Sequence, residues 1–379
     1  MGTEWEWTPA PSDSSYTRGV QRREDPHPDP GSSGAHRLSK RATAASSGIK
    51  VYPLMRAIVY DRYGPPEVLH VTDVPKPVPK ANEVLVRVIA TTVNQTDCGF
   101  RRGEPWIVRL FSGLVRPKRC ILGNELSGEV EAVGADVTTF RAGDQVCGLT
   151  GDTFGTYAEY VCLRADAPIV LKPGNLSTQE ATATWDGPWL ALTCLRQAAV
   201  GSGQHVLIYG ASGSIGTSAV QLAKHLGAHV TAVCNTKNLD LVRSLGADEM
   251  VDYTRTDFTR LDRTFDVVLD AVGKSTFGAC RRLLKPDGRY LSTDLGPWWQ
   301  NPLLQVWTGI VGGQKAGLAI PDSKRVRDDV QLLREIIEVK GFRPVIDRTY
   351  PLSEIVEAHR YVDTEQKTGS VVILVAGST

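Results

Sequence analysis

The sequence predicts a mixed α/β protein in which a β-rich N-terminal part precedes a doubly wound parallel sheet. Two patterns support this fold class. Between residues 56 and 163, short segments rich in β-branched residues are bounded by Gly, Pro or Asp, as in short strands separated by turns. After about residue 176, apolar strand-like segments alternate with helical patterns, as in a parallel sheet covered by helices.

The elements can be delimited segment by segment. In the first part, strands are predicted at residues 56–60, 69–74, 83–92, 125–133, 145–149 and 157–163. In the second part, strands are predicted at residues 204–209, 229–234, 249–251, 265–271 and 289–293, and helices at 217–226, at 239–245 and in a segment ending at 284. The tail is predicted to add a helix at 326–339, a strand at 345–346, a helix near 353–361 and a closing strand at 370–375.

The size and charge of the chain indicate a two-domain protein without a polyanionic partner. With 379 residues, of which 41% are hydrophobic, the chain is long enough to bury two cores. Its 43 basic residues nearly balance its 42 acidic residues, and the formal net charge is +1. We therefore expect neither nucleic acid nor an anionic membrane as a partner.

The cysteines and the N-terminal segment also carry information. The seven cysteines are widely spaced and form no C-x-x-C pair, so reduced thiols in the cytoplasm fit best. Residues 1–54 are rich in Ser, Pro, Gly, Arg and Asp and lack apolar periodicity, so we expect a disordered extension. This segment has no apolar stretch typical of a secretory signal, and its acidic residues argue against an organellar transit peptide.

The stretch HVLIYG-ASGSIG, residues 205–216, is the most informative in the chain. An apolar strand leads directly into closely spaced glycines and a helical pattern, which is the arrangement that holds a dinucleotide pyrophosphate on helix N–H groups. Ala211, Gly213 and Gly216 occupy three fingerprint positions, which serve in turn the sharp bend, the approach of phosphate and the packing of helix on strand. We predict that the cofactor is held by Gly210, Ala211, Ser212, Gly213, Ser214, Ile215 and Gly216.

The end of the next strand indicates which dinucleotide is bound. An NAD-preferring site usually presents Asp or Glu there, but this sequence continues with Asn235, Thr236 and Lys237. A 2′-phosphate would meet an amide, a hydroxyl and an ammonium, which favours NADPH over NADH. In the alternative interpretation, Asn235 and Thr236 only cap the helix that follows.

Several further motifs occur along the chain. They are Tyr63-Gly64-Pro65-Pro66-Glu67-Val68-Leu69, Val93-Asn94-Gln95-Thr96-Asp97, Gly123-Asn124-Glu125 with Gly128 and Val133-Gly134, Ala142-Gly143-Asp144-Gln145-Val146, and Ser244-Leu245-Gly246-Ala247-Asp248. With these motifs and the glycine turn, the chain from residue 55 to residue 375 resembles the medium-chain dehydrogenase/reductase superfamily. The resemblance is to its zinc-less, quinone oxidoreductase-like branch.

The resemblance implies a fold and a site. A GroES-like β-barrel domain would span residues 55–175 and be completed by residues 326–379, and a Rossmann NADP-binding domain would span residues 176–325. The active site would lie in the cleft between them. The family's cofactor contacts fall on Tyr253, after the third strand, and on Ala271, Val272 and Gly273, at the end of the fourth strand, although each also has a packing alternative.

The residues at the family's zinc positions argue against a metal. Zinc-using members place a Cys where this chain has Asn94 and a His where it has Asn124, which leaves Glu125 alone. A catalytic zinc needs three ligands drawn from Cys, His and carboxylate side chains. The four closely spaced cysteines of the family's structural zinc lobe are also missing, so we expect no bound metal.

Without a Lewis acid, hydride transfer from NADPH to an electrophile conjugated with a carbonyl, such as a quinone or an enone, is favoured. The charge that reaches the oxygen would need hydrogen-bond donors, and Asn94 is the first candidate. Thr96 or Tyr157 would supply a second donor or a proton, although Tyr157 is equally consistent with the barrel core. For Asn94 and Asp97 the alternative is a turn with helix capping, and both roles are compatible.

Two other functions remain open: a metal-free carbonyl reductase or alcohol dehydrogenase for small substrates, and an NADPH-binding protein without turnover. Residues 186–190 replace the family's usual Gly-Leu-Thr segment, and we expect the bulky Trp185 and Trp189 to narrow the cleft. A second aromatic cluster, Trp298, Trp299 and Trp307, is predicted to form a pocket wall or a homodimer surface, with core packing as the alternative. The apolar stretch that follows it is too short and too interrupted to span a membrane.

Overall fold

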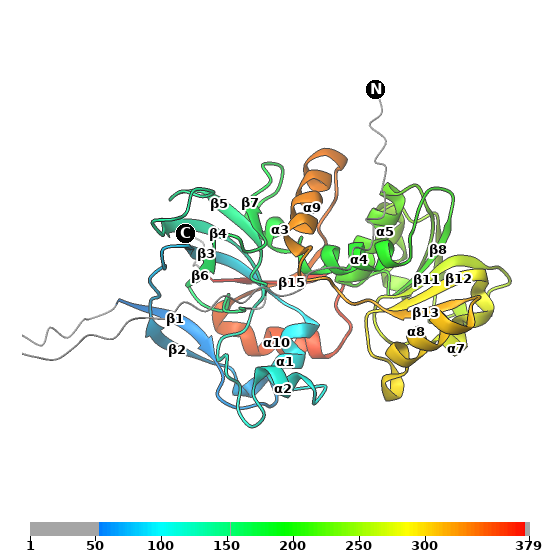
Figure 1. Cartoon of the computed structure of the whole chain (residues 1–379), viewed down its shortest axis with the longest axis horizontal. Helices are drawn as coiled ribbons and strands as arrows, with labels where there is room; N and C mark the ends of the chain where they lie inside the picture. Colours follow the sequence, from blue (N-terminus) through cyan, green and yellow to red (C-terminus); the bar gives the residue numbers. More distant parts are fainter. Residues whose placement is uncertain (1–52, 152, 376–379) are drawn as a thin grey trace, which may run out of the picture. The chain divides into compact units, whose positions relative to one another are not determined.

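The computed structural model describes residues 53–151 and 153–375. The predicted extension over residues 1–54 therefore lies outside the described residues, except for its last two positions. The described chain contains two large β-sheets and a separate antiparallel hairpin of β1 (Leu54–Val59) and β2 (His70–Pro75) (Figure 1).

The first large sheet has seven strands and is mostly antiparallel. Its order is β14-β15-β3-β4-β5-β7, and β6 also pairs with β3. On β3, alternate residues share a face of the strand, which buries Val84, Val86 and Val88 in one core. The strands are β3 (Glu83–Val93), β4 (Glu125–Val133), β5 (Gln145–Leu149), β6 (Tyr160–Arg164), β7 (Ile169–Leu171), β14 (Ile346–Pro351) and β15 (Ser370–Leu374).

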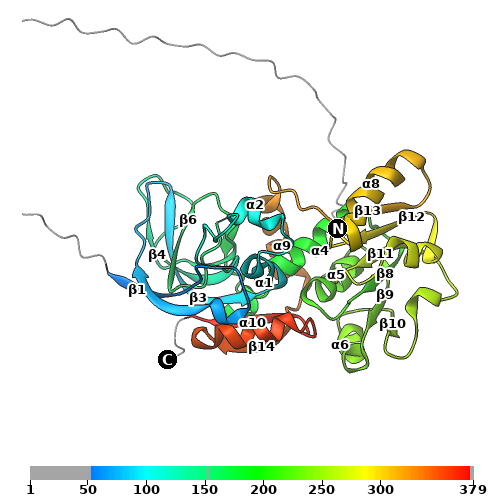
Figure 2. The same cartoon turned by 90° about the horizontal axis from the view of Figure 1, so that it is seen from below.

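The end of the described chain completes this first sheet. Strand β15 pairs antiparallel with β3, with Val371 opposite Val93, which confirms the expected return of the tail to the first sheet. The helix before β15, α10 (Ile355–Asp363), lies against the sheet (Figure 2) and buries Ile355, Ala358 and Val362 in the same core. The spacing of these three residues places them on one helix face.

The second large sheet has six strands, all parallel, in the order β10-β9-β8-β11-β12-β13. This confirms the predicted doubly wound sheet. Its strands are β8 (His205–Tyr209), β9 (His229–Cys234), β10 (Glu249–Asp252), β11 (Phe265–Asp270), β12 (Leu284–Ser292) and β13 (Lys315–Leu318). The remaining helices are α1 (Gln95–Arg102), α2 (Val108–Ser112), α3 (Thr178–Thr182), α4 (Asp186–Gln197), α5 (Ser214–His225), α6 (Leu239–Ser244), α7 (Phe277–Cys280), α8 (Gln300–Val311) and α9 (Val326–Lys340).

Four helices, α2 to α4 and α8, were not predicted, and most other differences from the predicted elements lie at element boundaries. Helix α5 begins at Ser214 rather than at residue 217, because the carbonyl of Gly213 already accepts the first helical hydrogen bond, from the N–H of Thr217. Strand β12 begins five residues earlier than predicted, at Leu284. The short strands β7 and β13 were not predicted, since three or four residues give too little periodicity to recognise.

The expectation that Trp185 and Trp189 narrow the cleft is wrong. The Trp185 side chain is fully buried in the core around α4 and α5, and its indole N–H donates to the carbonyl of Ala181 at 2.6 Å. The indole N–H of Trp189 donates to the Asp329 carboxylate at 3.2 Å, on the side that packs against α9. Both indole rings therefore pack against the protein interior near the first turn of α4, and neither narrows the cleft.

The boundaries of the two predicted domains stay a prediction, although the two sheets divide the chain in a similar way. None of the helices in the described part of the chain has the length and apolar content that crossing a bilayer requires. The aromatic cluster is not core: Trp298 is 96% exposed and Trp307 is 64% exposed.

Candidate active site

A cavity of about 450 Å³ lies along the carboxyl ends of the parallel strands. It is lined by residues at or next to the ends of strands of both sheets and by residues of α4 and α5. One wall comes from the start of α1, with Asn94, Gln95 and Thr96, and another from the start of α4, with Asp186 and Leu190. The rest of the wall is formed by the glycine turn, the ends of β9 to β11 and the segment before β15. Its residues are Tyr209, Gly210, Ser212, Gly213, Ser214, Ile215, Asn235, Asn238, Tyr253, Ala271, Val272, Lys274, Glu365, Gln366 and Lys367.

The glycine turn is built as the sequence predicts, with one correction. The sharp bend was assigned to Ala211, but the left-handed backbone, with φ of +80°, belongs to Gly210. A side chain at Gly210 would also meet Val272, since a Cβ there would lie 2.4 Å from Val272 Cγ1. At Gly216 a Cβ would lie 2.1 Å from the carbonyl oxygen of Gly210, so Gly216 serves the close packing of helix on strand.

The predicted turn residues divide into two groups. Gly210, Ser212, Gly213, Ser214 and Ile215 line the cavity, whereas Ala211 and Gly216 do not. The first N–H groups of α5 have no partner within the helix and point toward its N-terminal end, where an anion is also favoured by the helix dipole. The turn therefore fits a pyrophosphate, with Ala211 and Gly216 shaping it from behind.

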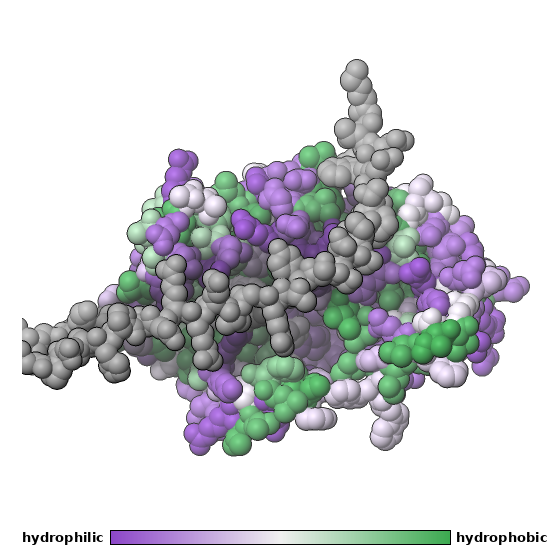
Figure 3. All heavy atoms as spheres, viewed as in Figure 1, coloured by the Kyte–Doolittle hydropathy of each residue, from purple (hydrophilic) through white to green (hydrophobic). Residues whose placement is uncertain are grey.

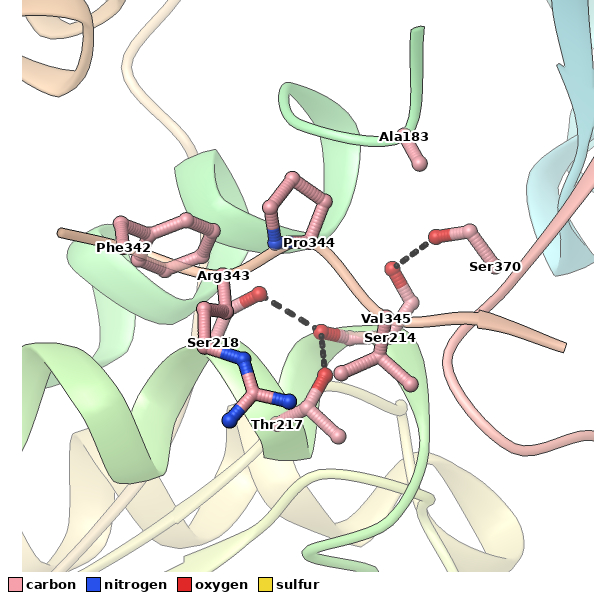
Figure 4. A pocket seen from close by; sticks show the side chains of 9 residues that line it. All are labelled: Ala183, Ser214, Thr217, Ser218, Phe342, Arg343, Pro344, Val345 and Ser370. Carbon is pink, nitrogen blue, oxygen red and sulfur yellow. Dashed lines mark hydrogen bonds between the residues drawn. The ribbon is translucent and has the colours of Figure 1, made fainter. Parts of the chain in front are cut away.

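The back of the turn is fixed by the closing strand. The N–H of Gly369 donates to the carbonyl of Ser212 at 2.8 Å. Next to this contact, the hydroxyl oxygens of Ser214 and Ser370 lie 3.1 Å apart, beside the small pocket that Phe342 and Arg343 border (Figure 4). The position of the turn thus depends on residues more than 150 positions later in the chain.

At the end of β9, the residues expected to select the cofactor lie apart. Asn235 lines the cavity, as do Tyr253, Ala271 and Val272, whereas Thr236, Lys237 and Gly273 do not. The Lys237 side chain is exposed. The alternative interpretation, in which Asn235 caps the next helix, holds only for its position. Asn235 precedes the first turn of that helix, but its side chain makes no capping hydrogen bond.

A carboxylate that the sequence analysis missed lies beside these residues. Asp252 ends β10 directly opposite Cys234, and it accepts a hydrogen bond from the Thr236 hydroxyl at 2.5 Å. The Asp252 carboxylate also accepts hydrogen bonds from Thr254 and lies 3.6 Å from Arg255. These partners hold its pKa below the ordinary value, with the Thr236 hydroxyl contributing most.

At the other end of the cavity, three polar side chains form a chain. The side-chain amide of Asn94 donates to the Asn124 carbonyl oxygen at 2.8 Å, and the Asn124 amide donates to the Asp186 carboxylate at 3.2 Å. Asn94 also caps α1, because its side chain accepts the N–H of Asp97 at 3.0 Å. Asn94 therefore combines the capping role with a place on the cavity wall.

The other predicted catalytic residues differ in position. Thr96 is exposed and lines the cavity. Asp97 is fully buried behind it, accepts the N–H groups of Asn94 and Gly123, and has its pKa raised by burial to about 7. The structure places Tyr157 in the core of the first sheet, fully buried and away from the cavity.

The residues at the family's zinc positions do not fit a metal. Both oxygens of Glu125 are already used: one accepts the Thr92 hydroxyl at 2.5 Å, and the other accepts the N–H groups of Trp185 and Asp186. Asn94 and Asn124 offer amides, which are not zinc ligands. Within residues 53–151 and 153–375, no group of three His, Cys, Asp or Glu side chains could hold a metal ion.

Several residues that line the cavity were not among the predicted site residues, and two of them lie near the predicted catalytic amide. Asp186 and Lys367 both line the cavity, near the chain of Asn94 and Asn124. Burial raises the pKa of Asp186, and the Asn124 hydrogen bond and the Lys367 charge partly oppose this shift. No local pattern marks Lys367, because it reaches the site only through the return of the tail to the first sheet.

The comparisons with known proteins show which family the chain belongs to. Residues 80–174 match the family model "Alcohol dehydrogenase GroES-like domain", and residues 245–373 match the model "Zinc-binding dehydrogenase". The 2-methylene-furan-3-one reductase of Solanum lycopersicum is 32% identical over 88% of this chain and 83% of its own length. The chain belongs to the medium-chain dehydrogenase/reductase superfamily.

Within this superfamily the chain belongs to the quinone oxidoreductase-like branch and is an oxidoreductase. The quinone oxidoreductase of Coxiella burnetii has a similar structure, with a TM-score of 0.75 and 31% identity over 86% of this chain and all of its own. The chloroplastic NADPH-dependent alkenal/one oxidoreductase of Arabidopsis thaliana is 28% identical over 84% of this chain and 79% of its own length. These medium-chain relatives support the mixed α/β fold with a GroES-like part and a Rossmann-like sheet.

The buried Glu125 carboxyl makes the stability of this dehydrogenase/reductase dependent on pH. Burial, followed by the charge of Asp186, raises the pKa of Glu125 from 4.5 to about 8. The folded protein therefore keeps a proton that the unfolded chain loses, so the free energy of unfolding should fall as the pH rises from about 4.5 to about 8. In the Glu125→Gln variant, the free energy of unfolding, measured by urea denaturation, should fall less steeply with pH across this range. If the variant and the wild type show the same dependence on pH, this assignment is contradicted.

Proposed function

We propose that the protein is a metal-free, NADPH-dependent reductase of quinones or α,β-unsaturated carbonyl compounds. The observation that carries this proposal is the cavity that joins the glycine turn to the Asn94 side chain, whose amide is hydrogen-bonded to Asn124. Its volume of about 450 Å³ suits a cofactor end and a small substrate. The names of the tomato and Arabidopsis relatives, an enone-type reductase and an alkenal/one oxidoreductase, support the same substrate class.

The chemistry divides between the cofactor and the chain. When bound, NADPH would supply a hydride, which is one proton with two electrons, and would leave as NADP⁺. A proton from solvent completes the reduced substrate. The glycine turn and the first turn of α5 bind the pyrophosphate on backbone N–H groups. The Asn94 amide donates to the oxygen on which negative charge develops, and Thr96 provides a hydroxyl on the same wall.

Steady-state assays test this function directly. The purified protein should oxidise NADPH in the presence of a quinone or an enone, and pre-incubation with a chelator should leave the rate unchanged because the described part of the chain offers no ligand set for a metal. Loss of activity with the chelator would contradict the metal-free mechanism. Turnover only with simple aldehydes or ketones would favour a carbonyl reductase, and tight NADPH binding without any turnover would favour a non-catalytic binding protein.

The preference for NADPH rests on Lys237 and its neighbours. The exposed ammonium of Lys237 follows Asn235 and Thr236 at the end of β9, where the 2′-phosphate of NADPH would lie. We propose that Lys237 provides most of the discrimination, helped by Arg255, which already compensates the charge of Asp252.

The Lys237→Ala variant should bind NADPH about fivefold more weakly, because an exposed charge pair contributes about 1 kcal/mol. NADH affinity, which serves as the internal control, should hardly change. Cofactor dissociation constants can be measured from nicotinamide fluorescence. Equal losses for NADPH and NADH would remove this basis for the preference.

The protein is also proposed to form a homodimer through α8. The inner side of α8 covers the edge of β13, because Thr308 and Gln305 accept the N–H groups of Ala316 and Leu318. The outer side is apolar, as the hydrophobic band over α8 shows (Figure 3), and it consists of Leu303, Val306, Trp307, Ile310 and Val311. These side chains are 61% to 80% exposed and follow helical spacing, so a second copy of the same helix is a matching partner.

Light scattering after size exclusion tests the dimer. The wild-type protein should have twice the mass of one chain, and Ile310→Glu should shift it toward the mass of one chain, since a charge in the apolar stripe is not paired. Val339→Glu is the matched control, because Val339 is 75% exposed on α9 and lies outside the stripe. A wild-type monomer, or a dimer that survives Ile310→Glu, would contradict the proposal.

A reducing compartment such as the cytoplasm is proposed as the location. All seven cysteines lie within the described residues and are free thiols, and five of them are fully buried: Cys98, Cys147, Cys194, Cys234 and Cys280. Free buried thiols are usual in reducing compartments.

A further inference from the structure

Lys367 is a lysine held in place inside the cavity. It lies on the segment between α10 and β15, and its ammonium donates to the carbonyl of Gly369 at 2.6 Å. Directly after Lys367, the segment is anchored by the Thr368 N–H, which donates to Asp347 at 2.8 Å, and by the Gly369 N–H, which donates to Ser212 at 2.8 Å. The side chain therefore has less freedom than an ordinary surface lysine.

The ammonium of Lys367 is available to a ligand. Among residues 53–151 and 153–375, no carboxylate forms an ion pair with it. The other lysine on the cavity wall, Lys274, is in contrast bound to Glu365 at 2.6 Å. Lys367 therefore provides a positive charge in the cavity with N–H groups that no carboxylate occupies.

Titratable groups on several elements influence the charge of this lysine. Asp186 on α4, Glu125 on β4, Asp347 on β14 and Cys98 on α1 would each raise the pKa of Lys367 when charged, whereas burial lowers that pKa more strongly. In return, the Lys367 charge lowers the pKa of Asp186. Asp186 and Lys367 thus form a separated charge pair across the end of the cavity that also holds Asn94.

We propose that Lys367 is the electrophilic residue of the site: its ammonium binds the carbonyl or quinone oxygen of the substrate and holds the negative charge that hydride addition places there. The inference rests on the proposed reductase function. When hydride adds to carbon, the π electrons of the substrate move to its oxygen, and the Lys367 N–H groups and the Asn94 amide form hydrogen bonds to that oxygen. A fixed donor in a half-buried site stabilises such an oxyanion without reorganisation.

Substitutions at Lys367 test the role in turnover. Lys367→Met removes the charge and the hydrogen-bond donor. Lys367→Gln also removes the charge but keeps a donor for the carbonyl of Gly369. If Lys367 had only a structural role, the Gln variant should therefore behave as wild type. We expect kcat to fall about 10²–10³-fold in both variants, with NADPH affinity nearly unchanged. Lys367→Arg should recover part of the rate, and Lys324→Met, an exposed lysine outside the cavity, should behave as wild type. Wild-type kcat in Lys367→Gln would overturn the assignment.

A binding measurement tests the same charge without turnover. The probe is 4-nitrophenol, whose ionised form absorbs at longer wavelength than its neutral form, titrated against the protein with and without NADP⁺. The wild-type protein should bind the phenolate and lower the pKa of the bound probe, and Lys367→Met and Lys367→Gln should each bind it at least tenfold more weakly. Equal binding by wild type and both variants, or no phenolate binding by wild type, would overturn the proposal.

The two measurements separate this inference from the proposed function. If the wild type reduces quinones or enones and the variants match it, the assignment of Lys367 fails while the reductase function stands. If no acceptor is reduced but phenolate binding depends on Lys367, the anion site stands and the reductase function fails.

Discussion

The site depends on one long-range contact, the pairing of β15 with β3 and the hydrogen bond from Gly369 to the glycine turn. The pairing brings residues near the end of the described chain beside the strand that leads to Asn94. The Gly369 hydrogen bond ties the same segment to Ser212. The amide at the start of α1, the turn at the start of α5 and the lysine before β15 therefore have fixed positions relative to each other.

Much of this arrangement could be predicted from the sequence, because it depends on local patterns. The apolar run of β8 and the glycines after it predict a strand, a bend and a helix in that order, and all three are present. The antiparallel and parallel sheets also follow from strand periodicity and from the alternation with helices. Even the capping role of Asn94 was foreseen, since an Asn followed three residues later by Asp is a typical helix start.

What the sequence did not predict depends on tertiary packing. Asp252 contacts Thr236 only because β10 pairs with β9 in a particular register, and no local sequence pattern specifies that register. Trp185 looked like a wall residue, but the turn between α3 and α4 directs it into the core, where its indole N–H finds a backbone carbonyl. The bend was assigned one residue too late because the sequence identifies the glycine-rich turn but not which residue adopts positive φ.

The three donors gathered on Glu125 have a consequence for how this branch differs from metal-using relatives. A Cys at position 94 and a His at position 124 would restore two ligand types, but Glu125 would have to rotate to become the third. That rotation would leave the Thr92 hydroxyl and the N–H groups of Trp185 and Asp186 buried without partners, at a cost of about 1–3 kcal/mol each. Building a zinc site from these residues would thus require rebuilding the start of α4 as well as exchanging two side chains.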